Sequence, residues 1–260
     1  MRLDPRAIAH DTLGLTEAQY LKHYQQGRFR EWNGVAFTAS ELPGPGFNFA
    51  AVLRDNTPSL DELLPVAREF FAPSAKGWGV LVEGDAGHPM EAELRARGWA
   101  IDEDEPAYVL PDLSAVQARS VAGLTIRRGE SQADTDTFYA LTAAAFHAPP
   151  EFASLMKPSP TFTLDPDIHL FIGSHAGVDV SAAGYSRQGE TAVLWGVATL
   201  EEHRGRGYGA AVCGVALSHA AGEGCVRAAL RSGPRSVPLY ERIGFRCACQ
   251  HRTYAAPMGS

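Results

Sequence analysis

Hydrophobic and polar positions follow strand-like and helix-like spacings in turn, beginning with a first set of elements in residues 31–111. "NGVAFTAS" and "FNFAAVLR" predict two strands joined by the turn-rich "ELPGPG". Apolar residues at helical spacing then predict a helix over 59–71, with Ser59 as its N-cap. "WGVLVEG" predicts a strand, "PMEAELRARGW" a short helix that ends at Gly98, and "EPAYVLP" another strand.

A second set of elements begins after the stretch "DLSAVQARSVAG". It opens with a strand at "LTIRRG", an amphipathic helix at "SQADTDTFYALTAAAF" and a Pro-rich loop at "HAPPEFASLMKPSP". A hairpin over "IHLFIGSHAG" and "DVSAAGYSR" leads to a long buried strand at "TAVLWGVATL", and a helix then runs to about Ala221. "VRAALRS", "SVPLYERIG" and "FRCACQHRTYAA" predict a strand, a helix and a closing strand or hairpin. The pattern predicts an α+β fold with a mixed α/β sheet.

Two short pieces of the chain repeat. "AELRARGW" (92–99) and "PLYERIGF" (238–245) each predict a short Arg-bearing helix followed by Gly and an aromatic residue. Aligning Gly98 with Gly244 places Leu94 opposite Tyr240. The repeat predicts two related units in tandem, residues 1–115 and 116–260, and chance similarity of two helix ends is the alternative.

Composition narrows the class of protein. The 260 residues are 45% hydrophobic and 20% charged, which is ordinary for a soluble globular protein. The sequence has no apolar run of roughly 18 residues that would span a membrane, and "MRLDPRAIAHDTLG" has no signal-peptide core, so a cytoplasmic protein is expected. The net charge of −7 argues against a general nucleic-acid binder. Four cysteines lack the spacing of a zinc site, and no metal is expected.

The richest local signal is "EEHRGRGYGAAVCGVAL", residues 201–217. It sets Gly205, Gly207 and Gly209 on alternate positions, with Arg204 and Arg206 between them, just before a predicted helix. The first turn of a helix has free N–H groups and a positive dipole end. Glycine lets the backbone approach an anion closely, and arginine adds charge. The stretch therefore predicts a phosphate-binding loop, with a simple tight turn as the alternative.

Comparison of this loop with two known kinds of phosphate-binding loop narrows the type of phosphate ligand. "GRGYGA" fits the G-x-G-x-x-A pattern of dinucleotide-binding folds, but residues 201–204 separate it from the preceding strand, and the next strand ends without an acid. A P-loop is excluded because no G-K-[ST] follows.

"VATLEEHRGRGYG", followed about 30 residues later by "PLYERIGF", resembles the GNAT superfamily of acyl-CoA-dependent N-acetyltransferases. The matching positions are Arg204, Gly207 and Gly209 in its Arg-x-x-Gly-x-Gly signature, and Leu239, Tyr240, Gly244 and Phe245 in its helix motif. Residues 30–115 resemble a degenerate copy, as in tandem GNAT proteins. The resemblance implies two tandem GNAT-like units, each a mostly antiparallel mixed sheet flanked by helices.

The resemblance also implies acetyl-CoA as cosubstrate, bound in the second unit alone. Backbone amides of the Gly/Arg loop would hold its pyrophosphate, and the strand before the loop would pair with its pantetheine arm. The residues implied in cofactor binding are Val197, Ala198, Thr199, Arg204, Gly205, Arg206, Gly207, Tyr208, Gly209, Ala210 and Ser232.

Transfer of an acyl group to an amine needs a neutral amine, a stabilised oxyanion and a proton for the leaving thiolate. Tyr240 matches the family's general acid, and a phenol with a pKa near 10 stays protonated at neutral pH. A packing tyrosine is the alternative for Tyr240. The general base is open between a water-mediated route and the side chains of Glu190, Glu201, Glu202, His147 and His169. Trp195, Phe146 and Tyr185 are candidates for lining an acceptor pocket, or equally for core packing.

These inferences lead to one main hypothesis, an N-acetyltransferase acting on an amine of a small molecule or peptide, as a monomer or homodimer. Residues 1–115 hold 10 basic and 18 acidic residues, which hints at a cationic acceptor. The main alternative is a non-catalytic acyl-CoA-binding or sensor module, because Trp195 and Gly196 stand where many family members have a glutamate. A nicotinamide-dependent oxidoreductase is a weaker third alternative.

Overall fold

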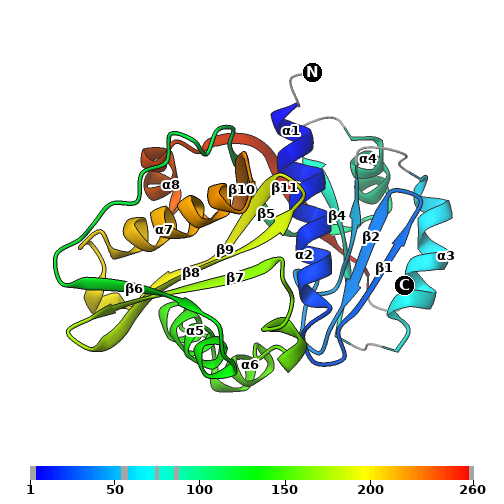
Figure 1. The fold of residues 1–260 in the computed structure, drawn as a ribbon. Helices are drawn as coiled ribbons and strands as arrows, with labels where there is room; N and C mark the ends of the chain where they lie inside the picture. The colour runs from blue at the N-terminus through cyan, green and yellow to red at the C-terminus, as the bar shows by residue number, and fades with distance from the viewer. Residues whose placement is uncertain (1–3, 54–57, 74–75, 85–87, 258–260) are drawn as a thin grey trace. The chain divides into compact units, whose positions relative to one another are not determined.

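The computed structural model describes residues 4–53, 58–73, 76–84 and 88–257, and its elements form two units (Figure 1). Unit 1 contains Met1–Tyr108 together with Arg231–Pro234 and Cys247–Ser260. Unit 2 contains Val109–Leu230 and Arg235–Arg246. The first compact unit thus also takes in the end of the chain, which the predicted ranges 1–115 and 116–260 place in the second unit.

The strands of unit 1 pair first in an antiparallel run and then in parallel. β1, β2 and β3 are antiparallel neighbours, and β4 lies parallel to β3. The last strand of the chain pairs antiparallel with β4, from Gln250 opposite Gly84 to Ala255 opposite Gly79. In sheet order the strands are β1 (Arg28–Trp32), β2 (Val35–Ala39), β3 (Phe49–Val52), β4 (Gly79–Gly84), β11 (Arg246–Ala255) and β5 (Ala100–Leu110).

Unit 2 repeats this pairing pattern. Its strands β6 to β9 form an antiparallel run, and β10 then lies parallel to β9. In sheet order they are β10 (Arg227–Arg231), β9 (Thr191–Thr199), β8 (Val178–Gln188), β7 (Ile168–His175) and β6 (Leu124–Gly129). An antiparallel run followed by one parallel neighbour occurs in both units, so the predicted fold of two tandem units with mostly antiparallel mixed sheets is confirmed.

The aligned helix ends have the same backbone geometry in both units. Gly98 (φ 76°) and Gly244 (φ 118°) both take the left-handed conformation that ends a helix. The amide of the following aromatic residue then bonds back to the aligned position, from Trp99 to the Leu94 carbonyl and from Phe245 to the Tyr240 carbonyl, each at 3.0 Å. The short sequence repeat therefore reflects a structural repeat.

Helices complete each unit. Unit 1 has α1 (Pro5–Ala7), a π-helical turn (Ile8–Thr12), α2 (Leu13–Leu21), α3 (Leu60–Phe71) and α4 (Pro89–Ala96). Unit 2 has α5 (Gln132–Ala145), α6 (Pro150–Leu155), α7 (Tyr208–Gly222) and α8 (Val237–Ile243), with 3₁₀ turns at Pro160–Phe162 and Glu201–His203. The helices before residue 22 and strand β1 had not been predicted.

The Pro-rich segment predicted as a loop contains α6, which corrects that prediction. Pro150 stands at the first helical position, where its missing N–H costs nothing and its fixed φ suits a helix. Proline in this segment thus starts a helix rather than preventing one.

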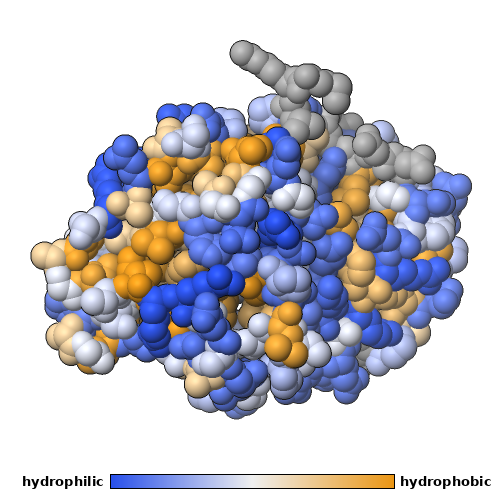
Figure 2. All heavy atoms as spheres, viewed as in Figure 1, coloured by the Kyte–Doolittle hydropathy of each residue, from blue (hydrophilic) through white to orange (hydrophobic). Residues whose placement is uncertain are grey.

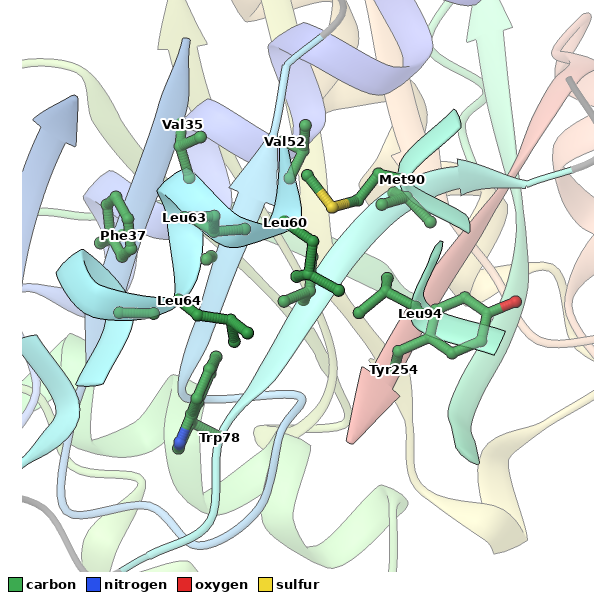
Figure 3. Close-up of a cluster of buried hydrophobic side chains, with 14 of the residues drawn as sticks. Val35, Phe37, Val52, Leu60, Leu63, Leu64, Trp78, Met90, Leu94 and Tyr254 are labelled. Carbon is green, nitrogen blue, oxygen red and sulfur yellow. The ribbon is translucent and has the colours of Figure 1, made fainter. Parts of the chain in front are cut away.

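The core of unit 1 explains why the last strand belongs there (Figure 3). Leu60, Leu63 and Leu64 of α3 belong to the same buried cluster as Phe37 of β2, and Tyr254 of β11 belongs to it as well. Each such side chain contributes about 1.5–3 kcal/mol when fully buried. A ring from β11 therefore fills the core of the first unit.

Helix α7 is apolar on most of its surface and is covered on more than one side. Val212, Ala216 and Leu217 are buried, and a Cβ added at Gly214 would lie 3.2 Å from Cα of Ala118, in the segment that precedes β6. The backbone of that segment thus packs directly against the helix. Figure 2 shows apolar residues among hydrophilic ones in the area where Figure 1 draws α7 and β6.

Candidate active site

The site is built around a bulge in β9. Opposite β8, Ala198 pairs with Ala182 but Trp195 pairs with Gly184, so β9 has one residue more than its partner between these pairs. Gly196, in this interval, has φ 59°, and a Cβ there would lie 2.6 Å from the Phe138 ring. Only glycine fits that position without displacing the ring.

Beyond the bulge, β9 has an edge that β10 does not cover. The parallel pairing with β10 joins Thr191–Val193 to Arg227–Ala229 and extends no further along β9. Residues 197–199 therefore lie past the paired part of the strand. The backbone N–H and C=O groups of such an edge can pair with an extended ligand.

A cavity of about 360 Å³ lies along this edge. A Cβ at Gly209 would sit 3.3 Å from Oγ1 of Thr199 and 3.8 Å from Leu239, so the start of α7, the end of β9 and helix α8 meet closely here. The lining residues are Ala145, Phe146, His147, Val197, Ala198, Thr199, Arg204, Gly209, Arg235, Ser236 and Leu239. Five of the predicted cofactor-binding residues thus share one cavity: Val197, Ala198, Thr199, Arg204 and Gly209.

The glycine loop leaves the start of α7 open. Gly207 is the N-cap residue, in the left-handed conformation (φ 82°), and no side chain caps the helix. The first backbone bond of the helix runs from the Ala211 amide to the Gly207 carbonyl at 3.0 Å. The amides of residues 208–210 therefore have no partner within the helix, and they point out of its positive end.

The side chains of this loop contribute differently from its backbone. Tyr208 is buried, and its ring lies 5.4 Å from that of His175, so its amide rather than its side chain is the group available to a ligand. Arg206 is exposed and donates to the Glu202 carbonyl at 3.2 Å. Arg204 donates instead to two carbonyls inside the unit, those of Thr199 and Ala145.

Tyr240 lies in α8 next to the cavity-lining residue Leu239. Its side chain is buried, with 6% of the residue exposed, and its ring meets that of Phe245 edge to face. Burial, with a smaller effect from Cys213, raises the pKa of the Tyr240 phenol well above its usual range. The phenol therefore stays protonated at neutral pH.

Several other candidates lie away from the cavity lining. Ser232 belongs to unit 1, where its hydroxyl donates to the Gly233 carbonyl. Trp195 packs edge to face against Phe138 and Phe162 and donates from its indole N–H to Ser186. These contacts leave the Trp195 side chain half-buried, outside the cavity lining.

A second group of candidates forms a separate cluster at the other end of α7. Tyr185 is fully buried and bonds to His219 at 2.8 Å, and Arg128 lies 3.2 Å from both His169 and His219. Burial, followed by the charge of Arg128, lowers the pKa of His169 to about 4. Neither Tyr185 nor His169 lines the cavity.

Among the candidates for the base, two come together at the cavity. His147 lines it, and its Nε2 lies 3.5 Å from Oε2 of Glu201. Glu190 instead pairs with Arg227 at 3.0 Å. Lining residues that sequence reasoning missed are Ala145, Arg235 and Ser236. For the last two, the only signal was their place directly before the helix "VPLYERIG".

Two further properties concern the described residues as a whole. Across the described parts of the chain, no three His, Cys, Asp or Glu side chains gather in an arrangement that could hold a metal ion. Within those same ranges, no helix combines the length and the apolar character needed to cross a membrane.

An open strand edge beside an uncapped helix start suits a ligand that carries an extended polar arm next to an anionic group. Residues 135–245 match the model of the acetyltransferase (GNAT) family. This part of the chain is therefore a GNAT acetyltransferase domain, and it contains both the bulged strand and the Gly/Arg loop. The predicted resemblance is confirmed, and the family supports acyl transfer from an acyl-CoA. No curated protein sequence matches the chain.

Solved structures extend the likeness in fold to both units. A GCN5-related N-acetyltransferase from Kribbella flavida has a TM-score of 0.71 at 19% identity, over 96% of each chain. A putative GNAT acetyltransferase from Novosphingobium aromaticivorans has a TM-score of 0.57 at 18% identity, over 96% of this chain and 97% of its own. A tandem GNAT protein from the clavulanic acid biosynthesis pathway has a TM-score of 0.63 at 14% identity, over 87% of this chain and 79% of its own.

Proposed function

We propose that this protein is an N-acetyltransferase that moves the acetyl group of acetyl-CoA to an amine of a small molecule or peptide. The observation that carries the proposal is the joint placement, at one cavity, of a β9 edge that β10 does not cover and an uncapped α7 start. The edge suits the amides of a pantetheine arm, and the helix start suits a pyrophosphate. A ligand with both groups in sequence is a coenzyme A thioester.

Each part of the coenzyme has a matching group in the chain. The amides of residues 205–210 would hold the pyrophosphate, with Arg206 adding positive charge at the surface. Val197, Ala198 and Thr199 would pair through their backbone with the pantetheine arm. Ser232 remains a predicted contact to that arm.

The reaction needs one bond to form and one to break. The neutral amine attacks the thioester carbonyl carbon, the C–S bond breaks, and the departing thiolate takes a proton. Tyr240 would supply that proton, since its phenol is protonated at neutral pH and matches the family's general acid. The proton released by the acylated nitrogen would leave through water or through His147, whose ring lies at the cavity wall beside Glu201.

A sensor that binds acyl-CoA without turnover is the second candidate. It is favoured by Trp195, which stands near the bulge, at a place where many family members carry a carboxylate. The Trp195 ring packs between Phe138 and Phe162. In that case the same cavity would bind acetyl-CoA and no amine would accept its acyl group.

Release of free thiol from acetyl-CoA, measured against a broad panel of amines, separates the two candidates. An enzyme releases thiol only when an accepted amine is present, and a sensor binds acetyl-CoA by calorimetry without any amine-dependent release. Absence of acetyl-CoA binding at near-millimolar concentration would refute both. The acidic first half of the chain makes polyamines and other cationic amines the first part of the panel to test.

A further inference from the structure

The side chain of Arg204 is used inside the domain rather than at its surface. Nε donates to the Thr199 carbonyl at 3.1 Å, and Nη2 donates to the Ala145 carbonyl at 2.7 Å. Thr199 ends β9, and Ala145 ends α5. One guanidinium therefore joins two elements that are more than 50 residues apart in sequence.

The bond to Ala145 completes the C-terminal end of α5. The carbonyls of Thr142, Ala143 and Ala144 accept from the amides of residues 146, 148 and 147 in the turn that follows. The Ala145 carbonyl accepts from Arg204 instead, and a positive charge is favourable at the negative end of a helix. The arginine thus caps this helix from a distant loop.

The bond to Thr199 fixes the end of β9 from one side, and Ser181 of β8 fixes it from the other. The Ser181 hydroxyl donates to the Ala198 carbonyl at 2.8 Å and lies 2.9 Å from Oγ1 of Thr199. Both Ala145 and Thr199 line the cavity. Arg204 therefore holds together two of its walls, the β9 edge and the end of α5.

We propose that Arg204 is a positioning residue for the acyl donor, which acts by holding the β9 edge against the end of α5 and not by pairing with the phosphates of the coenzyme. This inference deepens the proposed function and rests on it. The planar, forked guanidinium can span two carbonyls, whereas the single ammonium of a lysine cannot hold both in the same geometry. The contribution of Arg204 to donor binding is then independent of the phosphates of the donor.

Two donor probes test this role, acetyl-CoA and the phosphate-free S-acetylpantetheine. Dissociation constants are measured by calorimetry or NMR titration for the wild type, Arg204→Met, Arg204→Lys and Arg206→Met. Arg206 is the matched control, since its side chain is exposed and has a single contact to a carbonyl of its own loop. Thermal unfolding of each variant identifies those that are folded at the temperature of the titration.

Arg204→Met and Arg204→Lys should each weaken the binding of acetyl-CoA and of S-acetylpantetheine by the same factor. That factor should be roughly ten- to a hundredfold, as for the loss of hydrogen bonds from a charged donor. Arg206→Met should weaken acetyl-CoA alone. If Arg204→Met weakens only acetyl-CoA, and Arg204→Lys binds like the wild type, Arg204 is a phosphate ligand and the proposal is overturned. Unchanged binding of both probes to a folded Arg204→Met protein would overturn it as well. A wild-type chain that binds neither probe would instead overturn the proposed function itself.

Discussion

Helices α3 and α7 hold the same place in the two units, since each connects two parallel strands that are neighbours in the sheet. The two helices differ in how their first amides are capped. At α3, Ser59 and Glu62 cap one another's amides, and a carboxylate oxygen of Glu93 accepts from the Leu60 amide at 3.2 Å. At α7, Gly207 stands at the cap and no side chain fills the position. The first helix start is closed by two carboxylates of its own unit, and the second is open.

The difference shows that this fold does not by itself leave a helix start open to an anion. A phosphate at the start of α3 would meet the negative charges of Glu62 and Glu93, and the amides it needs are already bonded. The helix ends differ in the same sense, because the buried Leu94 occupies the place of Tyr240 and offers no hydroxyl. Part of the connection before α3, residues 54–57 of "RDNTPSLDELL", lies outside the described residues.

Blocking the open start of α7 should have the largest effect, a loss of acetyl-CoA affinity. Gly207→Glu places a carboxylate at a left-handed position beside the amides of α7 and should reduce acetyl-CoA affinity by about 10²–10⁴-fold, the loss expected for two hydrogen bonds to a charged group. Calorimetry with the wild type should give one site per chain. Gly177→Glu is the matched control, since Gly177 is also left-handed (φ 80°) with nothing within 4 Å of its added Cβ. Full affinity in folded Gly207→Glu, or two sites in the wild type, would falsify the contrast between the units.

The Tyr240 hydroxyl has no counterpart in unit 1, where Leu94 is the aligned residue. Removing this hydroxyl should lower turnover and leave acetyl-CoA binding unchanged. Tyr240→Phe keeps the ring and should lower kcat by roughly 10²–10⁴-fold, the range for general acid–base catalysis, with acetyl-CoA affinity little altered. Tyr185→Phe, another buried tyrosine of unit 2, should cost stability through its lost bond to His219 and change kcat only slightly. A kcat within a few-fold of wild type in Tyr240→Phe would assign its ring to packing.

Acid should destabilise each unit through a different buried histidine. The pKa of His169 is about 4 in the fold and near 6.5 in the unfolded chain, so unfolding takes up protons as pH falls. Its contribution to the free energy of unfolding is complete above about pH 6.5 and declines by at most about 3 kcal/mol towards pH 4. Burial, with the nearby His10, also lowers the pKa of His251 in unit 1.

Urea unfolding of His169→Phe and His251→Phe between pH 7 and pH 4.5 separates these effects. Each variant should lose less stability on acidification than the wild type, whatever its stability at neutral pH. If the free energy of unfolding of both variants falls with pH as steeply as that of the wild type, other groups govern the loss of stability in acid.

The smallest effect should come from opening the cap of α3. Ser59→Ala removes the side-chain partner of the Glu62 amide and should cost about 1 kcal/mol of stability, a typical value for a lost N-cap. It should leave acetyl-CoA affinity unchanged, because the start of α3 is still faced by the carboxylate of Glu93. Differential scanning calorimetry and a binding titration measure both quantities. A new binding site in Ser59→Ala would mean that the cap alone closes the first unit.

Most elements could be predicted because their signals are local. The caps of α3 and α5, the glycines that end α4 and α8, and the hairpin of β7 and β8 all depend on residues a few positions apart. Helix α6 was missed because its prolines favoured a loop on composition, although Pro150 suits the first helical position. Helix α2 has a weakly amphipathic sequence that buries Leu13, Ala18 and Leu21, so its periodicity gave little warning.

The sequence by itself determined the order of the elements, the internal repeat and the Gly/Arg loop, since periodicity, capping and glycine spacing are written within short windows. Tertiary structure decided that β11 lies in the sheet of unit 1, between β4 and β5, where Tyr254 belongs to the core. It also decided that Arg204 bonds to Ala145 rather than facing outward, and that Trp195 packs against Phe138 and Phe162. Each of these outcomes depends on partners distant along the chain, and only packing and hydrogen bonding in the folded protein select among such partners.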